Sequence, residues 1–227
     1  FVPLKRSALQ GEIVGPLADL HLHQTFGYTR AQCLQTLEAL YRFPLPGDAA
    51  VTGVTVHFGA VAIVATLAAR EAAEAEYATA KQEGRQAVLA KREGPDLFTL
   101  QVAGLQPDQE IVVETHYIQL ARSTGAGWSV RVPLTTAPRY VRSDERSPGG
   151  SPGPVQGQPL ALLRDPGHRF ALNLRLRGVA KVTSATHPLA VTIVDGDAQV
   201  QLQGGEVLPD RDCVLHWTSQ QAEHQPH

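Results

Sequence analysis

The sequence predicts an all-β fold: an antiparallel β-sandwich with one packed α-helix at about residues 68–83, plus a C-terminal strand unit. In most apolar segments every second residue is polar, which is the period of a half-buried strand. One Asp-Gly pair lies between two such segments, where it predicts a hairpin turn. One stretch rich in Ala, Glu and Lys has the composition of a helix. These three observations predict strands along most of the chain and a single helix packed on them.

Composition narrows the possible functions. The chain has 227 residues and 43% of them are hydrophobic, so it can form a packed core. Its formal charge of −2 predicts no binding to nucleic acid or to an anionic membrane. Apolar stretches such as Val61–Ala69 are far shorter than the roughly 20 residues that span a bilayer, so no membrane insertion is expected. The chain begins with Phe and contains no Met, which indicates a fragment or a processed product.

Four segments are predicted to be strands. In Asp19–Phe26, Leu20 and Leu22 fall on one face, whereas His21 and His23 fall on the other. The other three segments are Leu97–Leu105, Glu110–Ile118 and Phe170–Arg177. Glu110–Ile118 is apolar on both faces near its middle, so we expect a central strand that is covered on both sides.

The most specific local prediction is a hairpin around Asp195-Gly196. This pair suits a two-residue type I′ turn, because both central positions need a positive φ. That turn pairs Ile193 with Ala198, Val191 with Val200, and Leu189 with Leu202. All three apolar pairs then share one face, so the turn and the hydrophobic pattern predict the same register.

The helix is predicted from a stretch without Gly or Pro. Ala68–Glu83 is rich in Ala, Glu and Lys, and Gly84 follows it where a C-cap glycine belongs. The predicted packed face consists of Ala69, Ala73, Tyr77 and Ala80. Small side chains on this face predict close packing onto a sheet.

Four prolines and four glycines between residues 143 and 159 divide the chain. We predict a domain at 1–142, a Pro/Gly-rich loop or linker at 143–159, a strand-rich extension at 160–218 and a polar tail at 219–227. The extension either packs on the first domain or leads to a further one. The linker contains a formal G-x-S-x-G match at Ser151, but no strand precedes it and no helix follows, so no catalytic role is expected.

The two cysteines, Cys33 and Cys213, exclude a disulfide-dense scaffold and a zinc site of four thiolates. Both lie beside apolar residues, which favours buried free thiols. One long-range disulfide between them remains an alternative, because pairing cannot be read from spacing.

His21 and His23 form the one metal-ligand spacing of interest. Two imidazoles on one strand face can bind a metal ion if His57 or His116 supplies a third ligand. The alternative, which we expect, is a half-buried polar face without a metal. No phosphate-binding or dinucleotide-binding glycine motif is present. We therefore assign no catalytic, cofactor-binding or metal-binding residue, and we expect no enzyme activity and no cofactor.

A series of motifs follows one another along residues 9–140. They are Tyr41-Arg42-Phe43-Pro44-Leu45-Pro46, an acidic Ala-rich stretch with Tyr77 and a later Gly84, Pro95-Asp96-Leu97-Phe98, Tyr117, and Pro138-Arg139-Tyr140. In this order and spacing they resemble the vault protein inter-alpha-trypsin (VIT) domain. Later in the chain, Asp210-Arg211-Asp212-Cys213 resembles the segment that leads to a von Willebrand factor A domain in such proteins. The A domain itself is then expected to be absent from this chain.

The same residues have physical roles. Pro44 and Pro46 cannot donate to a strand ladder, so the strand that contains Tyr41 should end there, at a sheet edge. Tyr77 and Phe98 are expected to be core residues.

The resemblance implies a non-catalytic interaction or structural module that braces or orients an adjacent A domain in assembly or adhesion. The expected partners are that downstream A domain and unidentified proteins. Extracellular and intracellular proteins both carry such domains, so the compartment stays open, with an extracellular or cell-envelope location slightly favoured. One alternative is a self-sufficient, adhesin-like binding module. Another is a metal-binding protein or enzyme that uses His21 and His23.

Overall fold

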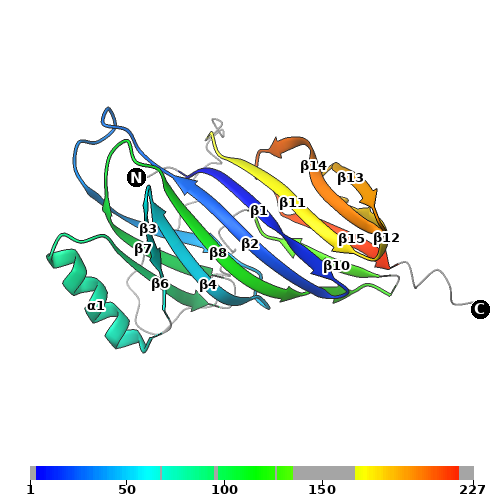
Figure 1. Ribbon diagram of the computed structural model, residues 1–227, viewed down its shortest axis with the longest axis horizontal. Coiled ribbons are helices and arrows are strands. Elements are labelled where there is room, and N and C mark those ends of the chain that lie inside the picture. Colours follow the sequence, from blue (N-terminus) through cyan, green and yellow to red (C-terminus); the bar gives the residue numbers. More distant parts are fainter. Residues whose placement is uncertain (1–3, 67, 95–96, 126, 135–166, 220–227) are drawn as a thin grey trace, which may run out of the picture.

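The computed structural model describes residues 4–66, 68–94, 97–125, 127–134 and 167–219, and it confirms the all-β prediction. Fifteen strands and one helix lie in these ranges and form three sheets (Figure 1). No helix in the described ranges is long and apolar enough to cross a membrane. The strands are β1 (Leu4–Val14), β2 (Leu17–Phe26), β3 (Leu37–Pro44), β4 (Ala50–Phe58), β5 (Val61–Val64), β6 (Ala87–Gly94), β7 (Leu97–Leu105), β8 (Ile111–Leu120), β9 (Arg122–Ser123), β10 (Trp128–Val132), β11 (Arg169–Arg177), β12 (Val179–Thr183), β13 (Leu189–Val194), β14 (Asp197–Val207) and β15 (Cys213–Ser219).

The largest sheet contains strands from both parts of the chain. Its order is β13-β14-β11-β1-β2-β8-β4-β5. Neighbouring strands are antiparallel throughout, except that β1 and β11 run parallel, with Ser7 opposite Phe170. Parallel neighbours need a crossover connection, which here consists of the whole chain between β1 and β11, β2 included. Strand β11 therefore extends the sheet that β1 and β2 begin.

The two smaller sheets share the core of the large one. They have the orders β12-β15-β10-β9 and β3-β7-β6. Phe26 of β2 contacts Tyr41 of β3, with ring centroids 3.7 Å apart. Phe170 of β11 and Trp217 of β15 are buried in the same cluster. Figure 1 shows the three-stranded sheet and the helix at one end of the molecule, and β12–β15 at the other. The N-terminal and C-terminal parts of the described chain thus share one hydrophobic core.

Strand β8 lies between β2 and β4, in the predicted central position. The prediction that both its faces are covered is wrong. Its residues alternate between buried and half-exposed, so that Thr115 and Tyr117 face the core while Glu114 and His116 face outward. The large sheet therefore has one face on the core and one open to solvent, the usual arrangement for an antiparallel sheet.

The helix, α1, runs over Arg70–Gln82, inside the predicted range. Gly84 follows it with a φ of 70°, as expected for a C-cap glycine. Tyr77 and Ala80 are its buried residues. They form a small cluster with Ala87, Leu89 and Ala103 of the three-stranded sheet. The Tyr77 hydroxyl donates to Glu38 Oε1 at 2.8 Å, so the side chain of Tyr77 anchors α1 on the three-stranded sheet.

Strands β13 and β14 form the predicted hairpin. Asp195 and Gly196 have φ values of 52° and 82°. The observed register pairs Ile193 with Ala198, Val191 with Val200, and Leu189 with Leu202, as predicted. The β14 members of these pairs are buried, whereas Val191 and Ile193 on the outermost strand are exposed.

The edge-strand prediction from the prolines is also confirmed. Strand β3 ends at Pro44 and is an outer strand of its sheet. The chain then turns at Gly47-Asp48, where the Ala49 amide donates to the Pro46 carbonyl at 2.9 Å.

Both cysteines are free thiols, so the disulfide alternative is not formed. Cys213 lies in β15 and is fully buried, as predicted, and burial raises the pKa of its thiol to about 11. The prediction of a buried thiol is wrong for Cys33. It lies in the connection between β2 and β3 and is only half-buried.

Candidate functional site

The outer face of the large sheet carries a cluster of titratable side chains. Strand β2 pairs with β8 so that His21 lies directly opposite His116. The two imidazole rings are stacked, with centroids 4.2 Å apart and planes 12° from parallel. Asp19 precedes His21 by two residues and so shares its face of β2. Its Oδ1 atom lies 2.6 Å from His116 Nε2 and 3.9 Å from His21 Nε2. We call Asp19, His21 and His116 the histidine cluster.

Each ring of the histidine cluster is also held at its second nitrogen. His21 Nδ1 lies 3.2 Å from Glu114 Oε1. His116 Nδ1 lies 2.8 Å from Thr52 Oγ1, and Thr52 donates to the main-chain oxygen of His116 at 3.2 Å. These contacts leave both Nε2 atoms facing Asp19. The ligand atoms of the cluster all lie within 4.8 Å of one another, a grouping that could hold a metal ion.

The structure separates the two histidines that the sequence pairs. His23 lies on the same face as His21, but their ring centroids are 6.5 Å apart and His23 is not part of the cluster. His57 is also outside it, with its Nε2 3.9 Å from Glu114 Oε2. Of the two possible third ligands, the structure thus brings His116 beside His21. Sequence reasoning missed Asp19, although its spacing from His21 already placed both on one face.

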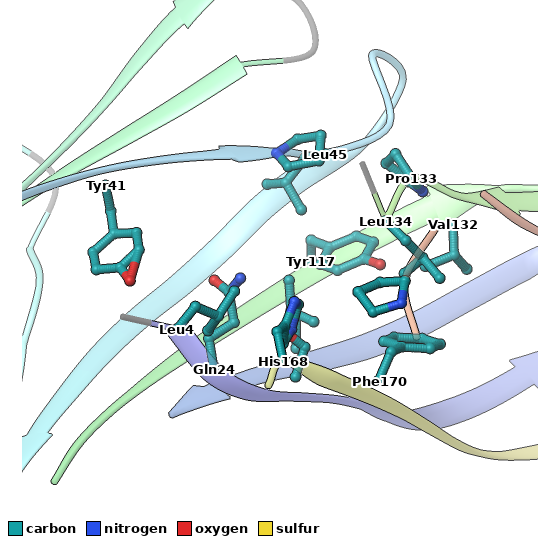
Figure 2. A pocket seen from close by; sticks show the side chains of 14 residues that line it. Leu4, Gln24, Tyr41, Leu45, Tyr117, Val132, Pro133, Leu134, His168 and Phe170 are labelled. Atoms are coloured by element: carbon teal, nitrogen blue, oxygen red, sulfur yellow. The ribbon is translucent and has the colours of Figure 1, made fainter. Parts of the chain in front are cut away.

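A second candidate lies in the interior, where a cavity of about 190 Å³ opens between the sheets. In Figure 2 the side chains of Tyr117, His168 and Phe170 surround this cavity. At its wall, Ser7 Oγ lies 2.9 Å from His168 Nε2. A serine beside a histidine can act as a nucleophile when a third group orients the histidine. The described residues place no carboxylate at His168 Nδ1, so we interpret the contact as the pairing of a buried hydroxyl with a half-buried imidazole.

Acid should weaken the fold through His168. Burial, with a smaller contribution from the charge of Arg169, lowers the pKa of His168 below its usual value of 6.5. Between the folded and the unfolded pKa, the unfolded chain binds more protons, so stability falls as pH drops below about 6.5. His168→Gln can still hydrogen-bond to Ser7 but has no imidazole to protonate. Between about pH 7.5 and about pH 5.5, we expect its melting temperature to fall by less than that of the parent. An equal loss in both proteins would contradict this. His187, whose pKa burial also lowers, stays in both and cancels in the difference.

Comparison with known families decides the identity of this fold. The family model for the vault protein inter-alpha-trypsin domain, VIT, matches residues 4–117, half of the chain. The chain belongs to the VIT family. The matched range covers β1 to most of β8, including α1, and it confirms the resemblance seen in the sequence motifs.

Curated relatives share this VIT region. Over 138 residues the chain is 32% identical to human protein mono-ADP-ribosyltransferase PARP4. This alignment covers 61% of this chain and 8% of the relative. Over 188 residues it is 32% identical to mouse von Willebrand factor A domain-containing protein 5A. This second alignment covers 79% of this chain and 23% of the relative. The second alignment is longer than the VIT match, so it includes residues outside the matched range. The chain spans less than a quarter of the length of either relative.

Among solved structures, the VIT chain is similar to an M1 zinc metallopeptidase from Deinococcus radiodurans. The similarity has a TM-score of 0.45 and 10% sequence identity, and it covers 95% of this chain and 42% of the peptidase chain. A likeness at this level carries no argument about function.

Several VIT motif residues lie in the core. Tyr41 contacts Phe26, Tyr117 is 1% exposed, and burial raises the pKa of both tyrosines. Phe98 is buried, with the Arg92 guanidinium 5.5 Å from its ring centroid. Phe43 belongs to β3. Outside the described residues lie Pro95, Asp96, Arg139, Tyr140, Ser151, the predicted linker at 143–159 and the tail beyond Ser219.

The motif Asp210-Arg211-Asp212 forms separate ion pairs within this VIT chain. Arg211 pairs with its neighbour Asp210, with Nη2 and Oδ2 2.9 Å apart. Asp212 pairs with Arg131 of β10 at 2.7 Å and accepts the Leu134 amide at 3.1 Å. The contacts of Asp212 join the beginning of β15 to β10, its neighbour in the sheet. They give Asp212 a structural role.

Proposed function

We propose that this VIT domain is a non-catalytic protein-interaction module that braces or orients an adjacent von Willebrand factor A domain. The observation that carries the proposal is the alignment with mouse von Willebrand factor A domain-containing protein 5A. It covers 79% of this chain and only 23% of a relative that, by its name, contains an A domain. In that protein, a region like this one is therefore joined to a much longer chain.

The outer strands of the large sheet offer surfaces for such a partner. Strand β5 exposes Val61 and Val64 at 51% and 66%, and β13 exposes Ile193 and Val194 at 50% and 51%. An outer strand also has free main-chain donors and acceptors that can pair with another strand. Strand β13 lies at the same end of the molecule as the end of β15 (Figure 1). A domain that follows β15 in the chain would begin at this end of the molecule, which supports β13 as its docking surface.

The test begins with the gene. We expect the codons after His227 to encode an A domain. That domain, produced separately, should bind the 227-residue chain in an isothermal titration. Ile193→Lys should weaken binding by at least about tenfold, because a charge would be buried at the docking surface. Val64→Lys, at the opposite edge of the sheet, is the matched control and should bind like the parent.

Two outcomes would reject bracing. One is no binding in the titration together with an unchanged melting temperature of the A domain when both are joined in one chain. The other is capture of a foreign partner by this chain alone, unaffected by EDTA and by addition of the A domain. The second outcome is what a self-sufficient adhesin-like module predicts.

A further inference from the structure

The hydrogen bonds at the two Nδ1 atoms are compatible with a tautomer that presents both Nε2 atoms to a metal ion. Glu114 is a carboxylate and only accepts, so His21 Nδ1 is the donor in their 3.2 Å contact. Thr52 Oγ1 can accept from His116 Nδ1 when its hydroxyl proton goes to the main-chain oxygen of His116. In this tautomer, with a proton on each Nδ1 atom, a neutral ring presents the lone pair of its Nε2 atom.

Without a metal ion, His116 Nε2–H donates to the carboxylate oxygen of Asp19, which only accepts. Asp19 Oδ1 lies 2.6 Å from His116 Nε2 and 3.9 Å from His21 Nε2. A lone pair and a carboxylate oxygen repel each other at such distances unless a cation lies between them. A proton on His116 Nε2 is one such cation, and a metal ion held by all three residues is another.

The spacing of the ligand atoms is close to that of a small metal centre. Two ligands bonded to tetrahedral zinc at about 2.0–2.1 Å lie about 3.3 Å from each other. The distances of 2.6 Å and 3.9 Å in the cluster lie on either side of this value. The contacts at Nδ1 also match known metal sites, in which a ligating histidine donates its other N–H to a carboxylate or another polar group.

From this geometry we propose that Asp19, His21 and His116 form a binding site for one divalent transition-metal ion, with Zn²⁺ as the preferred probe. Two imidazoles and one carboxylate suit zinc, whereas Mg²⁺ and Ca²⁺ prefer oxygen ligands alone. Side-chain exposure is 51% for Asp19, 39% for His21 and 31% for His116, so at least one coordination position is open to solvent. Glu114 and Thr52 are positioning residues that hold the rings. The site is independent of the proposed docking function.

Zinc titration of the full chain tests the site. His224 and His227 are replaced by alanine in every protein compared, so that the histidines near the C-terminus cannot contribute. We expect one Zn²⁺ per chain, and a cobalt-loaded sample with the visible absorption of a low-coordinate Co²⁺ site. His116→Ala should weaken zinc binding by at least about 100-fold, and Glu114→Ala by about tenfold, since loss of a supporting partner alone costs about 10- to 100-fold. Asp19→Asn keeps the shape of the side chain and tests the carboxylate without disturbing the fold.

His23→Ala is the matched control, because His23 lies on the same strand and face but outside the cluster. It should bind zinc like the parent, and circular dichroism should show each variant folded. Three results would each overturn the proposal: no zinc binding at about 100 micromolar metal, well above ordinary site affinities; binding that survives both His116→Ala and Asp19→Asn; or binding that His23→Ala removes as fully as His116→Ala does.

Discussion

Alanine in place of Gly11 should lower the free energy of unfolding by at least about 3 kcal/mol. Gly11 lies in β1, paired with Leu20 of β2 on one side and Leu174 of β11 on the other. A Cβ atom at this position would lie 2.1 Å from the main-chain oxygen of Asp19 and 3.0 Å from Leu20 Cα. Main-chain atoms cannot swing aside as the end of a side chain can, so β1 and β2 would have to separate.

Gly204→Ala is the control for this prediction. Gly204 in β14 has a positive φ, of 87°, and a Cβ atom there would meet nothing within 4 Å. It should cost only the backbone strain, about 1–2 kcal/mol. Urea denaturation followed by circular dichroism gives both values. Similar losses in the two variants would show that β1 and β2 can separate freely at Gly11, contrary to the structure.

Local patterns in the sequence were sufficient where neighbouring segments interact. The type I′ preference of Asp195-Gly196 and the apolar pairs beside it gave the register of β13 and β14. Composition and Gly84 gave the limits of α1. Pro44 marked β3 as an edge strand. In each case the deciding contacts lie within a few residues of one another, so propensity and turn chemistry determine the outcome.

The pairing of strands that lie far apart in the chain could not be predicted from the sequence. Alternation shows which residues of β2 share a face, but not that β8 lies beside it, so His21 could not be matched with His116. The parallel pairing of β1 with β11 joins Ser7 to Phe170 across a separation that no local pattern spans. The apolar outward side of β8 suggested a second covering layer, yet that side is half-exposed. Pairing of this kind depends on the packing of the whole core, which one sequence does not reveal.

Phe170→Ala should destabilise the whole chain, by about 3–5 kcal/mol. Phe170 is fully buried in β11 and belongs to the core cluster that all three sheets share. It also lines the cavity of about 190 Å³, so its loss would enlarge a space that is already incompletely filled (Figure 2). Because a single domain has typically only about 5–15 kcal/mol of stability, the variant should lose a large part of it.

The decisive measurement is whether that loss is cooperative between the two parts of the chain. Both tryptophans, Trp128 and Trp217, lie in the four-stranded sheet, so fluorescence reports on β10 and β15, while circular dichroism reports on all strands. The matched variant is Phe58→Ala, in β4, which lies next to the β5 edge of the large sheet. A shared core requires that both substitutions move the fluorescence and circular dichroism midpoints together. If Phe58→Ala left the fluorescence transition in place, the unit that contains β10 and β11–β15 would have to fold separately from the rest. The parallel pairing of β1 and β11 would then contribute little to holding the two parts together.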